Sequence, residues 1–202
     1  MSTIVLGGGV EVEHPLEVAL GFLEAYPGYE GHDSSGPVSF DERDLRLANR
    51  SGARISAAEI AAILERRGEI ERALRKVRPD ASLADATSSI PWIPLTRLFD
   101  AFADIRGIGF SKMTKALHRK RPALIPMLDS VVQAYLTRDD PGTGSSGSFG
   151  EHATALVRSY KRDLDRNRSA LEEIQQELES REYRLTDVRI LDLLIWSVAA
   201  GT

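Results

Sequence analysis

Apolar residues recur at intervals of three, four and seven positions through most of the chain, which is the spacing of amphipathic α-helices. The clearest stripe follows Ser56, which with Glu59 has the spacing of a helix-opening capping box. The stripe comprises Ile60, Ile63, Leu64, Ile70, Leu74 and Val77. The pattern therefore predicts one long helix from about residue 56 to residue 77, which Gly68 can kink.

A second long stripe predicts a helix over about 151–180, with charged residues crowded on its other faces. The residues after Thr186 are apolar nearly all round, which predicts a last helix buried in the middle of the protein. Shorter patterns predict helices at 15–26, 40–50 and 94–105, and on either side of the loop that ends at Asp129. We therefore expect an all-α fold of about seven helices.

The N-terminus departs from this helical pattern. Ile4 to Leu6 and Val10 to Val12 are rich in β-branched residues and flank three glycines, which favours a minor β-hairpin. A triple glycine can also cradle phosphate, but here no helix follows at once and no lysine is placed to help. The hairpin is the favoured interpretation.

Length and composition set the organisation of the chain. With 202 residues, 42% of them hydrophobic, the sequence predicts a single helical domain over 1–202. An alternative is two lobes, one formed by 1–91 with 151–202 and the other by the hairpin-containing segment 92–138. There is no cysteine, which excludes disulfides and thiolate metal sites, and the four histidines lack metal-ligand spacing. We expect neither a metal nor another cofactor.

The chain shows no apolar run of the roughly 20 residues that would cross a bilayer, and no secretory leader with a basic flank. These features predict a cytoplasmic protein with no membrane partner. The formal net charge of −4 argues against a generally basic protein that coats DNA. Contact with a nucleic acid would have to come from a local patch.

Residues 105–136 supply such a patch. Gly107-Ile108-Gly109 separates two predicted helices, and its glycines can adopt positive φ and leave backbone amides uncovered as a seat for phosphate. Between Asp104 and Asp129 the chain has no acidic residue, and the cations there suit a polyanion. They are Arg106, Lys112, Lys115, Arg119, Lys120 and Arg121.

These residues also carry a family resemblance. Gly107-Ile108-Gly109 before a helix resembles the helix-hairpin-helix motif, and the loop of Pro122 and Pro126 ending at Asp129 resembles the rest of the signature of helix-hairpin-helix (HhH-GPD-like) DNA glycosylases. The resemblance covers about residues 105–136. It implies an HhH-GPD-like core, a DNA duplex as partner, and chemistry on a flipped base at Asp129. Across its length the chain is also similar to an uncharacterised bacterial family with the pattern Lys-Arg-Pro-x-Leu-Ile-Pro-x-x-Asp-Ser-Val-Val, here at 120–132.

The resemblance further assigns roles around the hairpin. Family members with lyase activity carry a lysine two positions after the second glycine, where this chain has Ser111, 18 residues before Asp129. Serine there resembles the MutY-type adenine glycosylases, and Lys112 lies one residue out of register, so lyase activity is not expected. The expected nucleic-acid contacts are Gly107, Gly109, Ser111, Lys112, Lys115, Arg119, Lys120 and Arg121.

Three hypotheses follow from the sequence. The first is a monofunctional base-excision glycosylase in which Asp129 stabilises positive charge on the sugar or orients water. The second is a non-catalytic DNA-binding module, and the third is a partner-binding scaffold that uses the 151–180 helix and has no nucleic-acid role. An aromatic or polar cleft beside Asp129 would favour the glycosylase. An exposed hairpin with a filled site would favour the non-catalytic module, and buried ion pairs at Arg119 to Arg121 would favour the scaffold. Asp129 alone could equally be an ordinary helix N-cap.

Overall fold

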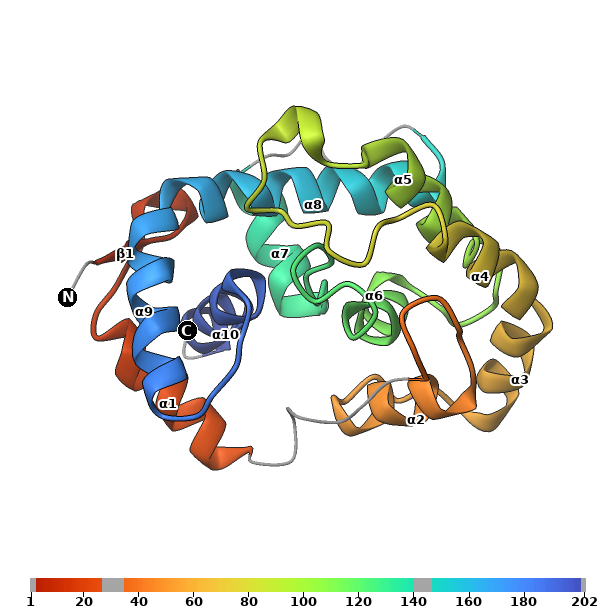
Figure 1. Cartoon of the computed structure of the whole chain (residues 1–202), viewed down its shortest axis with the longest axis horizontal. Helices are drawn as coiled ribbons and strands as arrows, with labels where there is room; N and C mark the ends of the chain where they lie inside the picture. Colours follow the sequence, from red (N-terminus) through yellow and green to blue (C-terminus); the bar gives the residue numbers. More distant parts are fainter. Residues whose placement is uncertain (1–2, 27–34, 140–146, 201–202) are drawn as a thin grey trace.

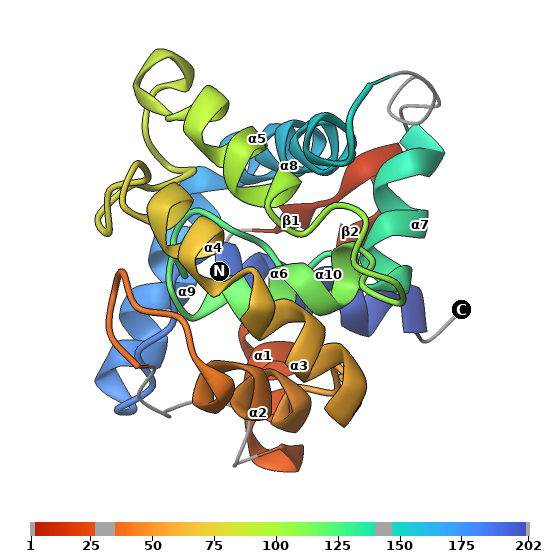
Figure 2. The same ribbon diagram turned by 90° about the vertical axis from the view of Figure 1, so that its right-hand side faces the viewer.

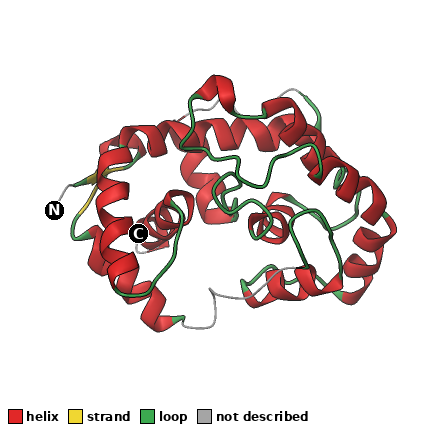
Figure 3. Ribbon diagram, in the orientation of Figure 1, coloured by secondary structure: helices red, strands yellow, loops and turns green. Residues whose placement is uncertain are grey.

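The computed structural model describes residues 3–26, 35–139 and 147–200, and this part of the chain is mostly helical (Figures 1 and 3). The expected all-α class is confirmed, but the expected helix count of about seven is wrong, because the described residues form ten α-helices. The first five are α1 (Pro15–Ala25), α2 (Glu42–Arg50), α3 (Ala57–Glu65), α4 (Arg67–Leu74) and α5 (Trp92–Asp100). The others are α6 (Phe110–His118), α7 (Ser130–Asp139), α8 (Phe149–Arg166), α9 (Arg168–Ser180) and α10 (Asp187–Ala200).

Two helices that the periodicity predicts as continuous are each broken once. The 56–77 stripe divides into α3 and α4 at Arg66, whose φ of −95° and ψ of 7° leave the helical region. The 151–180 stripe divides into α8 and α9 at Asn167, with φ −106° and ψ 12°. Tertiary contacts explain both breaks, since Arg66 Nη1 donates to the carbonyl of Ala103 over 2.5 Å and Asn167 bonds the backbone of Val5.

The expected N-terminal hairpin is present. Strands β1 (Ile4–Val5) and β2 (Glu11–Val12) pair antiparallel, with Ile4 opposite Val12. The three glycines between them form a 3-10 turn, in which Gly8 and Gly9 have φ of +72° and +75°. The outer edge of β1 meets Asn167, whose Oδ1 accepts from Val5 N at 2.7 Å and whose Nδ2 donates to Val5 O at 2.9 Å.

Helix α10 lies at the centre of one half of the molecule, packed against α1, α7, α8 and α9 (Figure 1). Its apolar residues from Val188 to Ile195 are buried, as the sequence predicts. In the other half α2 packs on α6 and α4 on α5, while the long α8 runs along α5 and also reaches α7 and α10 (Figure 2). One cluster of buried hydrophobic side chains extends through both halves. None of the described helices is long and apolar enough to span a bilayer.

Candidate functional site

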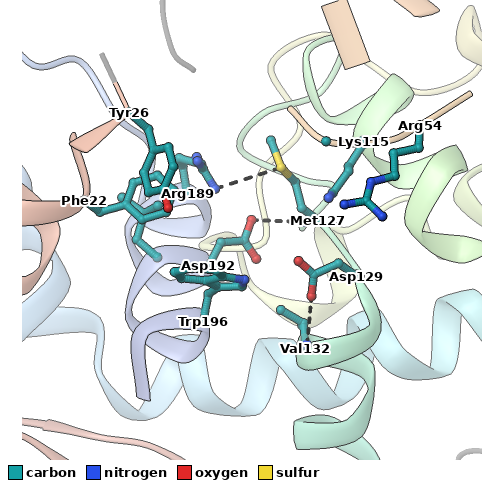
Figure 4. A pocket seen from close by; sticks show the side chains of 12 residues that line it. Phe22, Tyr26, Arg54, Lys115, Met127, Asp129, Val132, Arg189, Asp192 and Trp196 are labelled. Carbon is teal, nitrogen blue, oxygen red and sulfur yellow. Dashed lines mark hydrogen bonds between the residues drawn. The ribbon is translucent and has the colours of Figure 1, made fainter. Parts of the chain in front are cut away.

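An open cavity of about 380 Å³ lies between the two halves, with α10 and α1 on one side and α6 and the loop after α2 on the other (Figure 4). Its volume falls at the lower end of small-molecule sites, which measure roughly 300 to 1,000 Å³. The lining residues are Phe22, Tyr26, Gly52, Arg54, Lys115, Met127, Asp129, Val132, Arg189, Asp192, Leu193 and Trp196.

Asp129 lies on one wall of this cavity, at the start of α7. Its Oδ1 accepts hydrogen bonds from the backbone N–H groups of Val131 and Val132, both at 3.0 Å. The side chain is half-buried, and its second oxygen is turned toward the cavity (Figure 4). Asp129 is therefore an N-cap, and it also presents a carboxylate oxygen to the cavity.

The loop before Asp129 is held at several points by buried polar side chains. The Leu128 N–H donates to Thr114 Oγ1 at 3.0 Å, and the Met127 N–H donates to Asp192 Oδ2 at 3.1 Å. His118 Nδ1 lies 2.6 Å from the carbonyl oxygen of Ile125. Burial, with a smaller contribution from Arg189, lowers the pKa of His118 to about 3, so the ring is neutral and Nδ1 donates. These bonds fix the position from which Asp129 faces the cavity.

Asp192 faces Asp129 from the opposite wall. It lies on α10 with Arg189 three residues before and Trp196 four residues after it, a spacing that places all three on one helix face. Asp192 is 3% exposed, and its Oδ1 is buried and has no hydrogen-bond partner among the described residues. Buried polar atoms without a partner are rare in proteins and call for an explanation.

Burial raises the pKa of Asp192 to about 7, and the nearby Asp129 carboxylate contributes to the increase. Arg189, the Met127 N–H and Tyr160 oppose it. A carboxyl group whose pKa is raised by its surroundings, opposite a second carboxylate, is a common acid and base arrangement in enzymes. At neutral pH a large fraction of Asp192 therefore carries a proton that it can donate.

Three aromatic rings complete the wall on the α1 and α10 side. The rings of Phe22 and Tyr26 lie 4.8 Å apart, and Trp196 meets the Phe22 ring edge-on at 5.7 Å. Arg189 lies over the Phe22 ring at 5.6 Å. Trp196 is half-buried and lines the cavity. Aromatic faces of this kind can stack against a planar ring.

The hairpin turn differs in detail from the expected phosphate seat. Gly107 has the positive φ, +84°, whereas Gly109 is extended with φ −99° and serves as the N-cap of α6. The Glu59 carboxylate occupies the space beside the turn, where a Cβ on Gly107 would lie 2.2 Å from its Oε1. The same oxygen accepts from Lys112 Nζ at 2.6 Å. An acid from α3 therefore already neutralises this end of the cationic segment.

Two further cations of the segment are buried. Lys120 Nζ pairs with Asp44 Oδ1 at 2.7 Å, and both side chains are almost fully covered. Arg121 is 0% exposed and donates to the carbonyls of Val77 at 2.9 Å, Pro37 at 2.7 Å and Leu74 at 2.8 Å. Both side chains are unavailable for the duplex contacts expected of them. The cations of the acid-free segment between Asp104 and Asp129 thus pair with acidic residues of helices that are distant in the sequence.

The remaining expected contacts are divided between the surface and the cavity. Arg119 is half-buried and donates to Ser51 Oγ at 3.4 Å, and Ser111 is half-buried on α6 outside the cavity lining. Lys115, one helical turn after Ser111, does line the cavity. Sequence reasoning missed Arg54, Arg189 and Asp192. Charged residues inside the apolar stretch Val188–Val198 of α10 are a signal that could have pointed to Arg189 and Asp192.

Valine at Gly107 is expected to destabilise the protein more than valine at Gly109. A β-branched residue resists the left-handed conformation, and its Cβ would displace Glu59. Gly107→Val should therefore lower the free energy of unfolding by about 2 kcal/mol or more. A Cβ at Gly109 meets nothing within 4 Å. Urea unfolding of the two variants measures the difference, and equal losses would mean that the turn is not built as described.

Arg121→Met is expected to lower the free energy of unfolding by at least about 3 kcal/mol, because it leaves several buried carbonyl groups without a hydrogen-bond donor. Arg106 is exposed in the same cationic segment, and Arg106→Met serves as the matched control, with an expected change within about 0.5 kcal/mol. Chemical denaturation of both variants gives the comparison. Comparable stability of the two would contradict a structural role for Arg121.

Comparison with known families places this site in a wider set of sequences. The model of a family of unknown function, DUF6308, matches residues 23–199, which is most of the chain. The chain belongs to this DUF6308 family. The matched range includes the α6–α7 segment and nearly all of α10, and therefore both cavity carboxylates. No curated protein and no solved structure matches the chain.

Proposed function

We propose that this protein hydrolyses the N-glycosidic bond of a base held in the cavity, as a DNA glycosylase without lyase activity. The observation that carries the proposal is the open cavity at Asp129, with the aromatic side chains Phe22, Tyr26 and Trp196 on the opposite side. A base inside a duplex cannot reach such a cavity unless it is flipped out of the stack. The aromatic rings would hold the flipped base, and Asp129 would face the sugar.

The two carboxylates have complementary roles in this proposal. Asp192 donates its proton to the departing base as the bond between the sugar carbon and the base nitrogen breaks, and the bonding electron pair leaves with the base. The Asp129 carboxylate stabilises the positive charge that develops on the sugar. Water then bonds to the sugar carbon and gives its proton to Asp129. Solvent returns a proton to Asp192 and removes one from Asp129, which completes the hydrolysis.

The surroundings of the nearest lysine support a reaction without a covalent enzyme intermediate. Lys112, one residue from the position of the lyase lysine in the resembling family, is held by Glu59 and does not line the cavity. Abasic products should therefore be cleaved only after alkali is added.

The scaffold hypothesis also has an observation in its favour, namely the buried ion pair of Lys120 and the buried Arg121. Those contacts leave fewer cations for a duplex. They do not account for an open cavity lined by two carboxylates, Asp129 and Asp192, which the glycosylase proposal does. The non-catalytic module is disfavoured because the cavity is open and Glu59 lies against the hairpin.

The test is release of free base at low salt from four duplexes. One duplex carries an adenine opposite guanine, and the other three carry a single uracil, a single hypoxanthine or a single 7-methylguanine. Release from at least one duplex, with strand cleavage only after alkali, supports the proposal. Failure with every duplex, together with no duplex retention in filter binding at low salt, would contradict it.

A further inference from the structure

Two cations face the cavity without an acidic partner. Lys115 is 8% exposed, and Arg54 is exposed at the cavity rim. Among the residues that the structure describes, neither forms a hydrogen bond or an ion pair. Figure 4 shows the Arg54 guanidinium beside the Lys115 side chain, with both directed to the same part of the cavity.

The loop between α2 and α3 is built to hold Arg54 in this place. The Asn49 side chain clamps Ile55, with its Nδ2 donating to Ile55 O at 2.8 Å and its Oδ1 accepting from Ile55 N at 2.6 Å. Within the clamped loop Gly52 and Arg54 both have positive φ, +73° and +54°. A Cβ on Gly52 would lie 3.8 Å from Lys115 Nζ, which places the ammonium group against this loop. A left-handed arginine is uncommon and is often found at functional sites.

The charges around Lys115 compensate its positive charge only in part. Burial lowers the pKa of Lys115, and Arg189 and Arg54 add to the decrease, while Asp129 and Asp192 oppose it. The cavity lining contains three cations, Arg54, Lys115 and Arg189, against two carboxylates. One of these carboxylates, Asp192, is partly protonated at neutral pH. A buried ammonium beside a guanidinium is unfavourable unless an anion lies between them.

We propose that Lys115 and Arg54 form an anion site that binds a phosphoryl group attached to the sugar of the bound nucleotide. This inference rests on the proposed function and assigns the residues that bind the phosphoryl group next to the reacting sugar. The phosphoryl group lies near the rim on the α6 side, while the base lies against Phe22, Tyr26 and Trp196. Asp129 lies between them, where the sugar would be. The source of the phosphoryl group is either a phosphodiester of a strand or a terminal phosphate.

The site is tested by measuring the binding of four probes at low salt, with calorimetry and thermal shift as the two readouts. The probes are deoxyadenosine, deoxyadenosine 5′-monophosphate, inorganic phosphate and a single-stranded trinucleotide. We expect the phosphate-bearing nucleotides to bind and deoxyadenosine to bind far more weakly. Tighter binding of the trinucleotide indicates a phosphodiester, and tighter binding of the monophosphate indicates a terminal phosphate. If no phosphate-bearing probe binds better than deoxyadenosine, the proposal is wrong.

Variants separate this site from a merely structural role for Lys115. Lys115→Met should weaken nucleotide binding at least about thirtyfold and yet raise the melting temperature, because it removes a buried ammonium group that forms no ion pair with a described residue. Arg54→Gln should weaken binding in the same way. Lys76→Met removes an exposed lysine outside the cavity lining and should leave nucleotide binding unchanged. Unchanged binding by Lys115→Met, or a lowered melting temperature with normal binding, overturns the proposal.

Two further outcomes distinguish this proposal from the proposed function. If phosphate-bearing probes bind through Lys115 but no base is released from any duplex, the anion site stands and the glycosylase proposal fails. Borohydride treatment with an abasic duplex should leave Lys115 unmodified. A covalent adduct on Lys115 would show that the amine attacks the sugar, and the phosphoryl role would then be wrong.

Discussion

Replacement of Asp129 by asparagine is expected to lower the rate of base release at least about a hundredfold and to leave the melting temperature nearly unchanged. Asparagine caps a helix about as well as aspartate, so the bonds to Val131 and Val132 can persist. It carries no negative charge, so it cannot stabilise a cationic sugar. The same substitution therefore separates the structural role of this residue from the catalytic one.

The measurement is free-base release from whichever duplex the wild-type protein processes, with a thermal melt of both proteins. Asp104→Asn is a suitable control, because Asp104 is exposed, close in sequence to the hairpin and outside the cavity lining. The control should release base at the wild-type rate. Wild-type rates from Asp129→Asn would mean that Asp129 is only a helix cap, and the proposed mechanism would be wrong.

Replacement of Asp192 by asparagine is expected to stabilise the protein at pH 8 and to have little effect near pH 4. In the folded protein the pKa of Asp192 is about 7, above the ordinary value of 3.8 that applies when the chain is unfolded. Between these values the folded state holds a proton that the unfolded state has released, so this group makes stability fall as pH rises from about 4 to 7. The difference between the two pKa values corresponds to roughly 4 kcal/mol of folding stability lost by pH 8, and Asp192→Asn removes this loss.

Urea unfolding of both proteins at pH 4, 5, 6, 7 and 8 measures this effect, since all other carboxylates are common to the pair. Asp44→Asn is the contrasting variant. It removes the partner of the buried Lys120 and should destabilise the protein at pH 7. Parallel stability curves for wild type and Asp192→Asn would show that Asp192 is ionised throughout, and its proposed role as proton donor would be lost.

Local signals in the sequence were sufficient for much of the fold. The β-branched residues around the triple glycine predicted the hairpin, and the Ser56 and Glu59 pair predicted the start of α3, where both capping bonds form. Gly68 marks a possible kink in the first long stripe, but the positions of the breaks, Arg66 and Asn167, were not predictable in this way. Apolar periodicity continues through a bend, and the contacts that cause each break come from residues distant in the chain.

The candidate site shows the same division between local and distant information. The segment 105–136 led to Asp129, which does face a cavity, because its position after the loop is encoded locally. The cations of that segment were harder to interpret. Glu59 and Asp44, which pair with Lys112 and Lys120, lie 53 and 76 residues earlier, and no local pattern connects them. An acid-free run in a sequence therefore does not establish an uncompensated surface charge.

The contact between Asn167 and Val5 also bears on how the protein avoids association through its small sheet. A strand at the edge of a sheet presents N–H and C=O groups that can pair with a strand of another chain and start aggregation. On β1 these groups belong to Val5, and the Asn167 amide bonds both of them. A side chain from the break between α8 and α9 thus takes the place of a neighbouring strand, and at Val5 the edge offers no template for sheet growth.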